Sequence, residues 1–346
     1  MPAEAAVDTA RPSPERESVR ESVRESVFDC VGNTPIVALR RLFPDPGFEV
    51  LAKLELMNPG GSMKDRSARH IIEAGLAEGS IRPGSTVVES SSGNFGIALA
   101  MAARIHGLRF ICVVDPKTTS ANLTLLRQLG ATVEIASEPD AAGGYLHNRI
   151  RRVKELLAEL PGAIWANQYA NDRNWQAFYH GTGAELVEQL VRPPSYLFAP
   201  VSTTGSILGC SRRLRERFPA LRVIAVDAVG SVIFGSPPAH REIPGIGSSR
   251  VPELFRPDEI DDVVHVDDVE AAECCRDLLA AEGILAGGSS GAVVAAIRRT
   301  RSRLASTGRV LAIFPDRGDR YLDLVYDDDW LERMRSRRTR ATSAAH

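Results

Sequence analysis

Residues 58–66 are the most informative stretch of this chain, and they read Asn58-Pro59-Gly60-Gly61-Ser62-Met63-Lys64-Asp65-Arg66. A glycine-rich loop here leads into a helix expected over 64–78, whose first turn carries Lys64. When such a lysine is partly desolvated, its ammonium form is disfavoured and its amine becomes a better nucleophile. A solvated lysine at a helix start has the same local pattern, so the interpretation depends on other segments.

Two further polar loops follow expected strands and open expected helices. Ser91-Ser92-Gly93-Asn94 comes after a strand at 86–89, and Ser202-Thr203-Thr204-Gly205-Ser206 comes after a strand at 196–201. Backbone N–H groups and hydroxyls at a helix N-terminus bind anions. The first loop therefore suits a carboxylate, and the second, which has no basic side chain, suits a permanently bound phosphate. The second is neither a Walker loop nor a GxGxxG fingerprint. For each, an ordinary capped helix start is the alternative.

The order of the expected elements predicts the fold class. Short β-rich runs alternate with helical patterns between residues 27 and 326. Strands are expected at 48–54, 86–89, 109–114, 132–136, 163–166, 196–201, 222–227 and 310–314. Helices are expected at 64–78, 94–106, 120–129, 144–159, 173–191, 205–217, 267–282 and 290–304. This alternation predicts an α/β fold of mostly parallel sheets covered by helices, with ligands at the carboxyl ends of the strands.

The composition argues against several classes of protein. The chain has 346 residues, of which 44% are hydrophobic and 25% charged, and its formal net charge is -2. No basic excess indicates nucleic acid, and no apolar run reaches the ~18–20 residues that a membrane span needs. The five cysteines lack CxxC or framework spacing, which favours buried thiols in a reducing compartment and predicts no metal site. We therefore expect a cytoplasmic enzyme.

The two ends of the chain differ from its body. Residues 1–14 are rich in Ala, Pro and Ser, and Arg-Glu-Ser-Val occurs three times over 16–27. These features predict a flexible tail over 1–26, with at most a marginal helix. Residues 331–346 are basic and low in apolar residues, which predicts a second flexible tail.

An ordered set of motifs makes the chain similar to a known family. Besides the three loops above, the set comprises Gly32-Asn33-Thr34-Pro35, Ala166-Asn167-Gln168-Tyr169, Gly245-Ile246-Gly247-Ser248-Ser249-Arg250-Val251-Pro252 and Gly287-Gly288-Ser289-Ser290-Gly291-Ala292. This order resembles cysteine synthase and cystathionine β-synthase. The resemblance runs from about Val27 to about Tyr326. It implies the two-domain tryptophan-synthase-like (type II) fold and the cofactor pyridoxal 5'-phosphate.

The resemblance implies a role for each matched residue. Lys64 matches the catalytic lysine that holds the cofactor as a Schiff base. Asn94 matches the residue that hydrogen-bonds the cofactor's ring hydroxyl, and Ser289 matches the hydroxyl partner of the pyridine nitrogen. The phosphate-binding loop corresponds to Ser202, Thr203, Thr204, Gly205 and Ser206. The loops that hold the carboxylate of the amino-acid substrate correspond to Ser91, Ser92, Gly93, Asn94 and Gln168.

The resemblance also implies how the chain is divided. An N-terminal domain over 27–165 carries Lys64, and its first strands cross to the other domain. Within it, the residues around 110–149 form a mobile subdomain that closes over the substrate. A C-terminal domain over 166–330 carries the phosphate loop. A homodimer is implied by the resemblance alone, and the other partners are small amino-acid substrates.

Three departures from cysteine synthases bear on the substrates. Phe95 stands where threonine is usual, the phosphate loop lacks the usual Gly-Thr-Gly-Gly-Thr, and Arg250 stands where an aromatic residue is usual. This combination resembles the subfamily that makes 2,3-diaminopropionate precursors for siderophores and peptide antibiotics. Its members join O-phospho-L-serine to L-glutamate and form N-(2-amino-2-carboxyethyl)-L-glutamate. In that interpretation Arg250 binds an anionic substrate.

Three alternatives stay open at this point. The first is a cysteine synthase that combines sulfide with O-acetylserine or O-phosphoserine. Serine and threonine dehydratases share the fold but usually carry Ser-Phe-Lys and Gly-Asn-His, where this chain has Ser-Met-Lys and Gly-Asn-Phe. A catalytically silent binding or regulatory relative is the alternative from another class.

Overall fold

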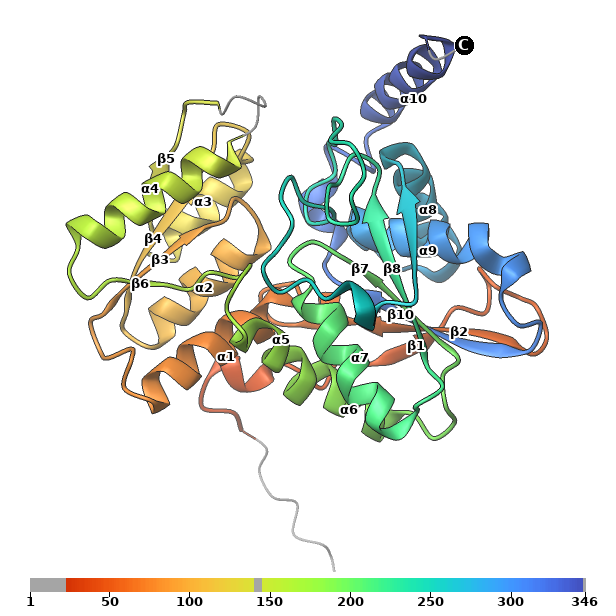
Figure 1. Ribbon diagram of the computed structural model, residues 1–346, viewed down its shortest axis with the longest axis horizontal. Coiled ribbons are helices and arrows are strands. Elements are labelled where there is room, and N and C mark those ends of the chain that lie inside the picture. The colour runs from red at the N-terminus through yellow and green to blue at the C-terminus, as the bar shows by residue number, and fades with distance from the viewer. Residues whose placement is uncertain (1–22, 140–144, 345–346) are drawn as a thin grey trace, which may run out of the picture.

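The computed structural model describes residues 23–139 and 145–344. These residues form two lobes, each built on one sheet (Figure 1). The larger sheet has the strand order β1-β2-β10-β7-β8-β9, and the smaller has the order β5-β4-β3-β6. Neighbouring strands pair in parallel, except that β1 and β2 are antiparallel. The expected α/β class with two mostly parallel sheets is confirmed.

The elements follow one another in alternation along the chain. The strands are β1 (Ile36–Ala38), β2 (Phe48–Leu54), β3 (Thr86–Ser90), β4 (Arg109–Val114), β5 (Thr132–Ile135), β6 (Ile164–Trp165), β7 (Tyr196–Pro200), β8 (Arg222–Ala228), β9 (Asp262–Val266) and β10 (Gly308–Phe314). The helices are α1 (Lys64–Ala77), α2 (Asn94–Ile105), α3 (Ser120–Gln128), α4 (Leu146–Glu159), α5 (Arg173–Phe178), α6 (Ala184–Gln189), α7 (Gly205–Arg217), α8 (Asp268–Glu282), α9 (Gly288–Thr300) and α10 (Asp328–Ala344).

The structure differs from the sequence-based expectation at the two ends. The tail expected over 331–346 is instead, as far as Ala344, the continuation of helix α10. Trp330, Leu331 and Met334 are buried on one side of this helix, and three apolar anchors among many arginines are too few to give a clear helical period. At the other end, residues 1–22 lie outside the described residues, and Ser26 caps the short helix η1 (Val27–Cys30).

Helices cover both faces of each sheet. In the larger lobe, α8 and α9 pack on one face, and α5, α6 and α7 pack on the other. In the smaller lobe, α1, α2 and α3 share one face, while α4 covers the opposite one. Burial on both faces explains why most central strands are continuous apolar runs instead of alternating patterns.

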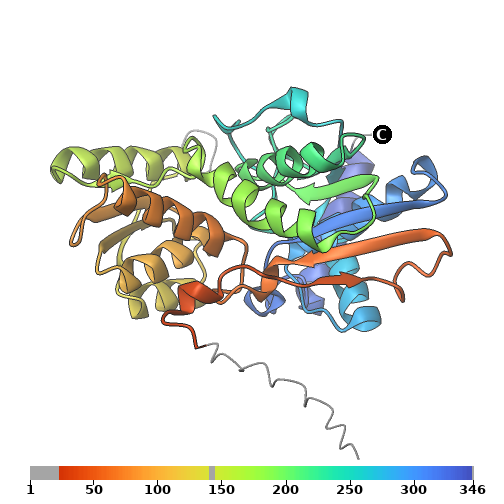
Figure 2. The ribbon, with the colours of Figure 1, turned by 90° about the horizontal axis from the view of Figure 1, so that it is seen from below.

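Helix α1 belongs to both lobes at once. It packs against α2 of the smaller lobe and against α5 of the larger one. Strands β1 and β2 precede α1 in the sequence, yet they pair into the sheet of the larger lobe, which they reach by running beneath the molecule (Figure 2). The lysine at the start of α1 is therefore carried on a helix that contacts both lobes.

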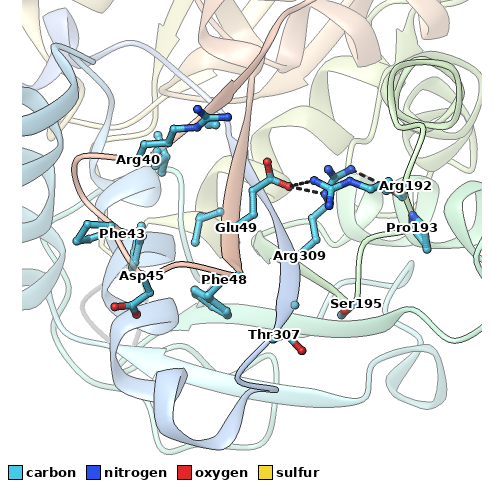
Figure 3. A pocket seen from close by; sticks show the side chains of 16 residues that line it. Arg40, Phe43, Asp45, Phe48, Glu49, Arg192, Pro193, Ser195, Thr307 and Arg309 are labelled. Carbon is cyan, nitrogen blue, oxygen red and sulfur yellow. Dashed lines mark hydrogen bonds and ion pairs between the residues drawn. The ribbon is translucent and has the colours of Figure 1, made fainter.

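The two ends of the larger sheet have different characters. At the carboxyl ends of its strands lie the glycine- and serine-rich loops. At the amino ends lies a cavity of about 660 Å³, lined among others by Arg192, Glu49 and Arg309 (Figure 3). Glu49 accepts hydrogen bonds from Arg192 at 3.0 Å and from Arg309 at 2.7 Å, so these charges are satisfied within the chain.

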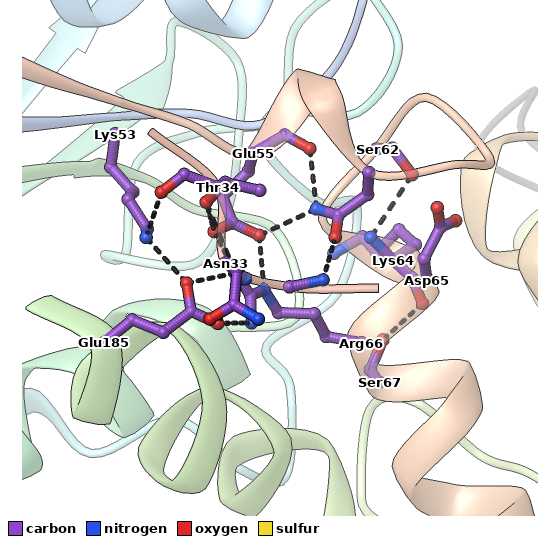
Figure 4. Close-up of polar contacts among 12 residues, drawn as sticks. Asn33, Thr34, Lys53, Glu55, Ser62, Lys64, Asp65, Arg66, Ser67 and Glu185 are labelled. Carbon is purple, nitrogen blue, oxygen red and sulfur yellow. Dashed lines mark hydrogen bonds and ion pairs between the residues drawn. The ribbon is translucent and has the colours of Figure 1, made fainter. Parts of the chain in front are cut away.

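A buried cluster of charges joins α1 to the larger lobe (Figure 4). The Arg66 guanidinium donates to both carboxylate oxygens of Glu55, at 2.6 and 2.8 Å, and to both of Glu185, at 2.6 and 2.8 Å. Glu55 follows β2, and Glu185 lies in α6. Paired bonds of this kind are the geometry that a planar guanidinium favours.

Lys53 completes the same cluster from within strand β2. Its fully buried ammonium donates to Glu185 at 2.6 Å, to the carbonyl of Thr34 at 2.7 Å and to Gln189 at 2.9 Å, which uses all three of its hydrogens. Burial would raise the pKa of Glu185, but the hydrogen bonds from Arg66 and Lys53 outweigh this and hold it at about 2. Every charge in the cluster therefore has an opposite partner.

We expect Arg66→Ala to lower the free energy of unfolding by about 3–5 kcal/mol, because it leaves Glu55 and Glu185 buried without their partner. Urea denaturation followed by circular dichroism measures this. The matched control is Arg151→Ala, whose ion pairs with Glu138 and Glu155 are exposed and should contribute less than about 1 kcal/mol. Equal losses in the two variants would contradict the assignment.

Candidate active site

The predicted motif residues meet at one cavity of about 220 Å³ between the two lobes. Each comes from the carboxyl end of a strand or the start of a helix, as expected for a parallel sheet. Of the predicted site residues, the cavity wall includes Lys64, Ser91, Ser92, Gly93, Asn94, Gln168, Ser202, Thr203, Ser206 and Ser289. Thr204, Gly205 and Arg250 are not part of the wall.

Lys64 is the first residue of α1. Its backbone N–H donates to the Ser62 hydroxyl at 3.2 Å, and the preceding loop turns at Gly61, whose φ is +81°. Burial disfavours the ammonium and lowers the pKa of Lys64 to about 8, while the neighbouring Asp316 carboxylate acts in the opposite direction. A substantial fraction of neutral amine at mildly alkaline pH is what a nucleophile or general base needs.

The Ser202–Ser206 loop opens helix α7. Thr204 is the N-cap and adopts a left-handed conformation with φ 62°. In the part of the chain that the structure describes, its buried hydroxyl has no hydrogen-bond partner. A Cβ on Gly205 would lie 2.7 Å from the Asn174 side chain, so the loop has no room for a larger residue there. An unpartnered hydroxyl beside the N–H groups of a helix start fits a bound phosphate.

The Ser91–Asn94 loop joins β3 to α2. The Ser91 hydroxyl accepts from the backbone N–H of Gly96 at 3.0 Å, which shapes the turn. The Ser92 hydroxyl accepts from Arg149 at 3.2 Å, and its carbonyl accepts from Asn122 at 3.0 Å. The loop is therefore tied both to its own helix and to helices α3 and α4.

Glu89 joins that loop to the segment that carries Gln168. Its carboxylate accepts from the Ser90 N–H at 2.8 Å, from the Trp165 indole at 3.3 Å and from the Gln168 N–H at 3.3 Å. Burial raises the pKa of Glu89 to about 7. Asn174 then donates to the Gln168 carbonyl at 2.6 Å and to Thr203 at 3.0 Å, which connects the Gln168 segment to the Ser202–Ser206 loop.

Sequence reasoning missed several residues of the cavity wall. The most central is Asp316, two residues after β10, which accepts from Asn94 at 2.7 Å and from Ser289 at 3.4 Å. The others include Lys117, Arg149, Tyr169, Arg320 and Tyr321. A signal for Asp316 was available, since a polar residue just after a buried parallel strand lies at the ligand-binding edge.

Arg250 lies next to the cavity wall without forming part of it. Its guanidinium pairs with Glu253 and stands over the ring of Tyr169, 5.2 Å from the ring centroid. Tyr169 does line the cavity. The predicted contact of Arg250 with an anionic substrate stays a prediction.

The described residues contain no group of three or more His, Cys, Asp or Glu that could hold a metal ion. Within the same ranges, no helix is both long and apolar enough to cross a bilayer.

With no ligand bound in the cavity, we expect Lys64 to react with acetic anhydride half-maximally near pH 8. The neutral amine is the reactive form, and its fraction rises as the pH passes the lowered pKa. Mass spectrometry of the peptide that carries Lys64 measures the extent of reaction at each pH. A reaction that begins only near the ordinary pKa of lysine, about 10.4, would contradict the lowered value.

Comparisons with known proteins agree with this site. The family model described as "Pyridoxal-phosphate dependent enzyme" matches residues 27–316. N-(2-amino-2-carboxyethyl)-L-glutamate synthase of Ralstonia nicotianae is 58% identical over 318 residues, which cover 92% of this chain and 94% of that protein.

Two solved structures are also similar to this chain. The O-acetylserine-dependent cystathionine β-synthase of Helicobacter pylori has a TM-score of 0.82 at 35% identity, over 88% of this chain and 98% of that one. O-ureido-L-serine synthase has a TM-score of 0.81 at 32% identity, over 90% and 99%. The resemblance to cysteine synthases is confirmed, and the chain belongs to the family of pyridoxal-phosphate dependent enzymes, as a β-replacing transferase of the cysteine synthase type.

Proposed function

We propose that this enzyme joins O-phospho-L-serine to L-glutamate, releasing phosphate and forming N-(2-amino-2-carboxyethyl)-L-glutamate. The relative of that name, 58% identical over 92% of the chain, supports this reaction. Such a product is a precursor of 2,3-diaminopropionate for a siderophore or a peptide natural product. In the structure, the observation that carries the proposal is the charge of the cavity wall.

Cations outnumber carboxylates in that wall. Among the described residues and apart from Lys64, which would be bonded to the cofactor, its cations are Lys117, Arg149 and Arg320, and its carboxylate is Asp316. O-phosphoserine brings a phosphate dianion, and glutamate brings two carboxylates. O-acetylserine and sulfide carry fewer negative charges to this wall, so its charge favours the anionic pair.

Arg149 is the side chain best placed for the phosphate. It reaches from α4 to the Ser92 hydroxyl at 3.2 Å, next to the loop proposed to hold the carboxylate. It also pairs with Asp115 at 3.1 Å, and its buried Nε has no hydrogen-bond partner among the described residues. A guanidinium fixed beside this loop at the cavity wall suits a phosphate oxygen.

The residues of the chain fit the cofactor. Lys64 would hold its aldehyde carbon, and the Ser202–Ser206 loop, with the unpartnered Thr204 hydroxyl, would hold its phosphate. Asn94 and Ser289 would contact its ring. When bound, pyridoxal phosphate withdraws electrons from the α-carbon of the amino acid, which makes the α-proton acidic and lets the β-substituent leave.

The side chains then have separate tasks. Lys64, whose pKa is lowered to about 8, takes the α-proton on Nζ and later returns it. The Ser91–Asn94 loop and Gln168 orient the carboxylate of phosphoserine, and Arg149 attracts the departing phosphate. We propose that residues 110–149, of which 140–144 lie outside the described residues, close over the substrate and exclude water.

A cysteine synthase that uses sulfide is the second candidate, because O-acetylserine-dependent cystathionine β-synthase shares the fold at 35% identity. A catalytically silent relative is less favoured, because Lys64 and the phosphate loop are both intact and face one cavity. Incubation with O-phosphoserine plus glutamate or sulfide, with mass detection of the products, separates these candidates.

We expect Arg149→Gln to lower kcat/KM for O-phosphoserine by about tenfold to a hundredfold, the range for losing a hydrogen bond to a charged group. The value for O-acetylserine should change much less. Arg151→Gln, on the exposed side of the same helix, is the control. An equal loss with both substrates would mean that Arg149 does not act on the phosphate.

We also propose that the chain forms a homodimer through the amino ends of β2 and β10. Val191 is 88% exposed there. Val191 lines a shallow cavity together with Ile36, Leu51 and Leu190. This shallow cavity adjoins the larger cavity of Figure 3, because Arg192 and Arg309 line both. The resemblance to cysteine synthases implies a homodimer, and we assign its contact to this apolar hollow with its exposed valine.

Val191→Asp should convert the dimer to a monomer, because it would bury a carboxylate without a partner at the contact. Light scattering coupled to size-exclusion chromatography measures the mass. Ile135→Asp, at an exposed site of the smaller lobe, should leave the mass unchanged. A wild-type monomer, or a dimer that survives Val191→Asp, would refute this interface.

A further inference from the structure

The segment 315–317 lies between the two loops that carry Lys64 and Ser289. On one side, the Met63 N–H donates to the Pro315 carbonyl at 2.8 Å, and the Arg317 N–H donates to the Gly61 carbonyl at 3.1 Å. On the other side, the Gly287 N–H donates to the Asp316 carbonyl at 2.9 Å. The backbone of Asp316 is therefore held in place by both loops.

The Asp316 carboxylate collects donors from three separate elements. Its Oδ2 accepts from Asn94 Nδ2 at 2.7 Å and from the Tyr321 hydroxyl. Its Oδ1 lies 3.4 Å from the Ser289 hydroxyl. A Cβ on Gly287 would lie only 2.2 Å from the same Oδ1, so the chain leaves space here for the carboxylate alone.

The Asn94 amide is fixed from both ends. Its Oδ1 accepts from the Arg320 guanidinium, which also donates to the Gly60 carbonyl at 2.6 Å, and its Nδ2 donates to Asp316 at 2.7 Å. A flipped amide would place its oxygen against a carboxylate and its NH₂ against a guanidinium, and both contacts would be repulsive. An amide nitrogen carries two hydrogens, one of which goes to Asp316. The Tyr321 side chain at the cavity wall also lies within hydrogen-bonding reach of Asn94, so the amide turns its donor end toward the cavity.

Asp316 itself is buried, with 3% of its surface exposed. Burial raises the pKa of its carboxyl, while hydrogen bonds from Tyr321 and Asn94 and the charges of Arg320 and Lys64 act in the opposite direction. The buried carboxylate is thus surrounded by donors and cations, although none of the steps proposed above uses it.

We propose that Asp316 is a positioning residue for the cofactor: together with Arg320 it fixes Asn94 as a hydrogen-bond donor into the cavity, and it orients the Ser289 hydroxyl from the same carboxylate. This inference rests on the cofactor contacts proposed for Asn94 and Ser289. It does not depend on which amino acids the enzyme joins. One carboxylate would then align both contacts to the cofactor ring.

Asp316→Asn tests this role, because it keeps the shape of the side chain but offers an NH₂ group in place of an acceptor. Asn94 would lose its fixed orientation. We expect the holoenzyme variant to release pyridoxal phosphate at least tenfold faster than wild type and to show a shifted absorbance maximum of the bound cofactor. Dialysis against a cofactor-trapping reagent and visible spectroscopy measure the two effects without any substrate.

A matched variant separates positioning from the general effect of losing a carboxylate in this segment. Asp319→Asn removes an exposed carboxylate three residues from Asp316, and it should change neither the release rate nor the spectrum. If Asp316→Asn alters only the melting temperature, the proposal is overturned.

A double-mutant cycle tests whether Asp316 acts through Asn94. In an Asn94→Ala background, Asp316→Asn should speed cofactor release by clearly less than it does in wild type, because the group that it positions is gone. Equal effects in the two backgrounds would overturn the proposal.

If the Asp316→Asn chain does not fold, Arg320→Gln removes the other half of the amide's fixation. It should also speed cofactor release at least tenfold. An unchanged release rate would overturn the proposal. Since each readout concerns the cofactor alone, a failure here is distinguishable from a failure of the phosphoserine and glutamate assignment.

Discussion

The bidentate pairing of Arg66 with Glu55 and Glu185 is the interaction on which the site depends. Arg66 lies two residues after Lys64, Glu55 directly follows strand β2, and Glu185 lies in α6. Charges removed from water in this way are stable only when each finds its partner. The pairing therefore sets the position of the lysine-bearing helix relative to the larger sheet. Gly32 fits closely against the pair, since a Cβ there would lie 2.9 Å from Glu185 and 3.0 Å from Arg66.

Around this anchor, the parallel sheets bring the remaining parts of the site together. Loops that are far apart in the sequence follow β3 and β6 of the smaller sheet and β7 and β10 of the larger one. The parallel strands of each sheet end on the same side, and the loops at these two carboxyl edges line one cavity. Polar side chains then connect one loop to the next. Glu89 links the Ser91–Asn94 loop to Gln168, Asn174 links Gln168 to Thr203, and Asp316 links Asn94 to Ser289. The site is thus a chain of hydrogen bonds that crosses from one lobe to the other.

Much of the fold was predictable because its elements are long and their signals local. The strands expected at 48–54 and 109–114 have the observed bounds. The expected helix over 173–191 is in fact two short helices separated by a π-helical turn at Tyr179–Gly183, which no local pattern announces. Strands β1 and β9, which were not expected, are edge strands that each pair with one neighbour, β1 with β2 and β9 with β8. Helix α10 was not expected from the sequence, because only a few of its residues form an apolar face.

The sequence by itself determined the class of fold, the family, and which segments carry a lysine, a run of hydroxyls or a glycine turn, because these properties depend on residue type and local spacing. Only the tertiary structure decided which charges surround the cavity. Arg149 and Lys117 come from surface-like segments of the smaller lobe, and Asp316 and Arg320 come from the far end of the chain. The local sequence around these four residues does not distinguish them from charged residues that are exposed to solvent. The reason is physical, since the role of a charge depends on what shares its desolvated space, and that is set by contacts between residues hundreds of positions apart.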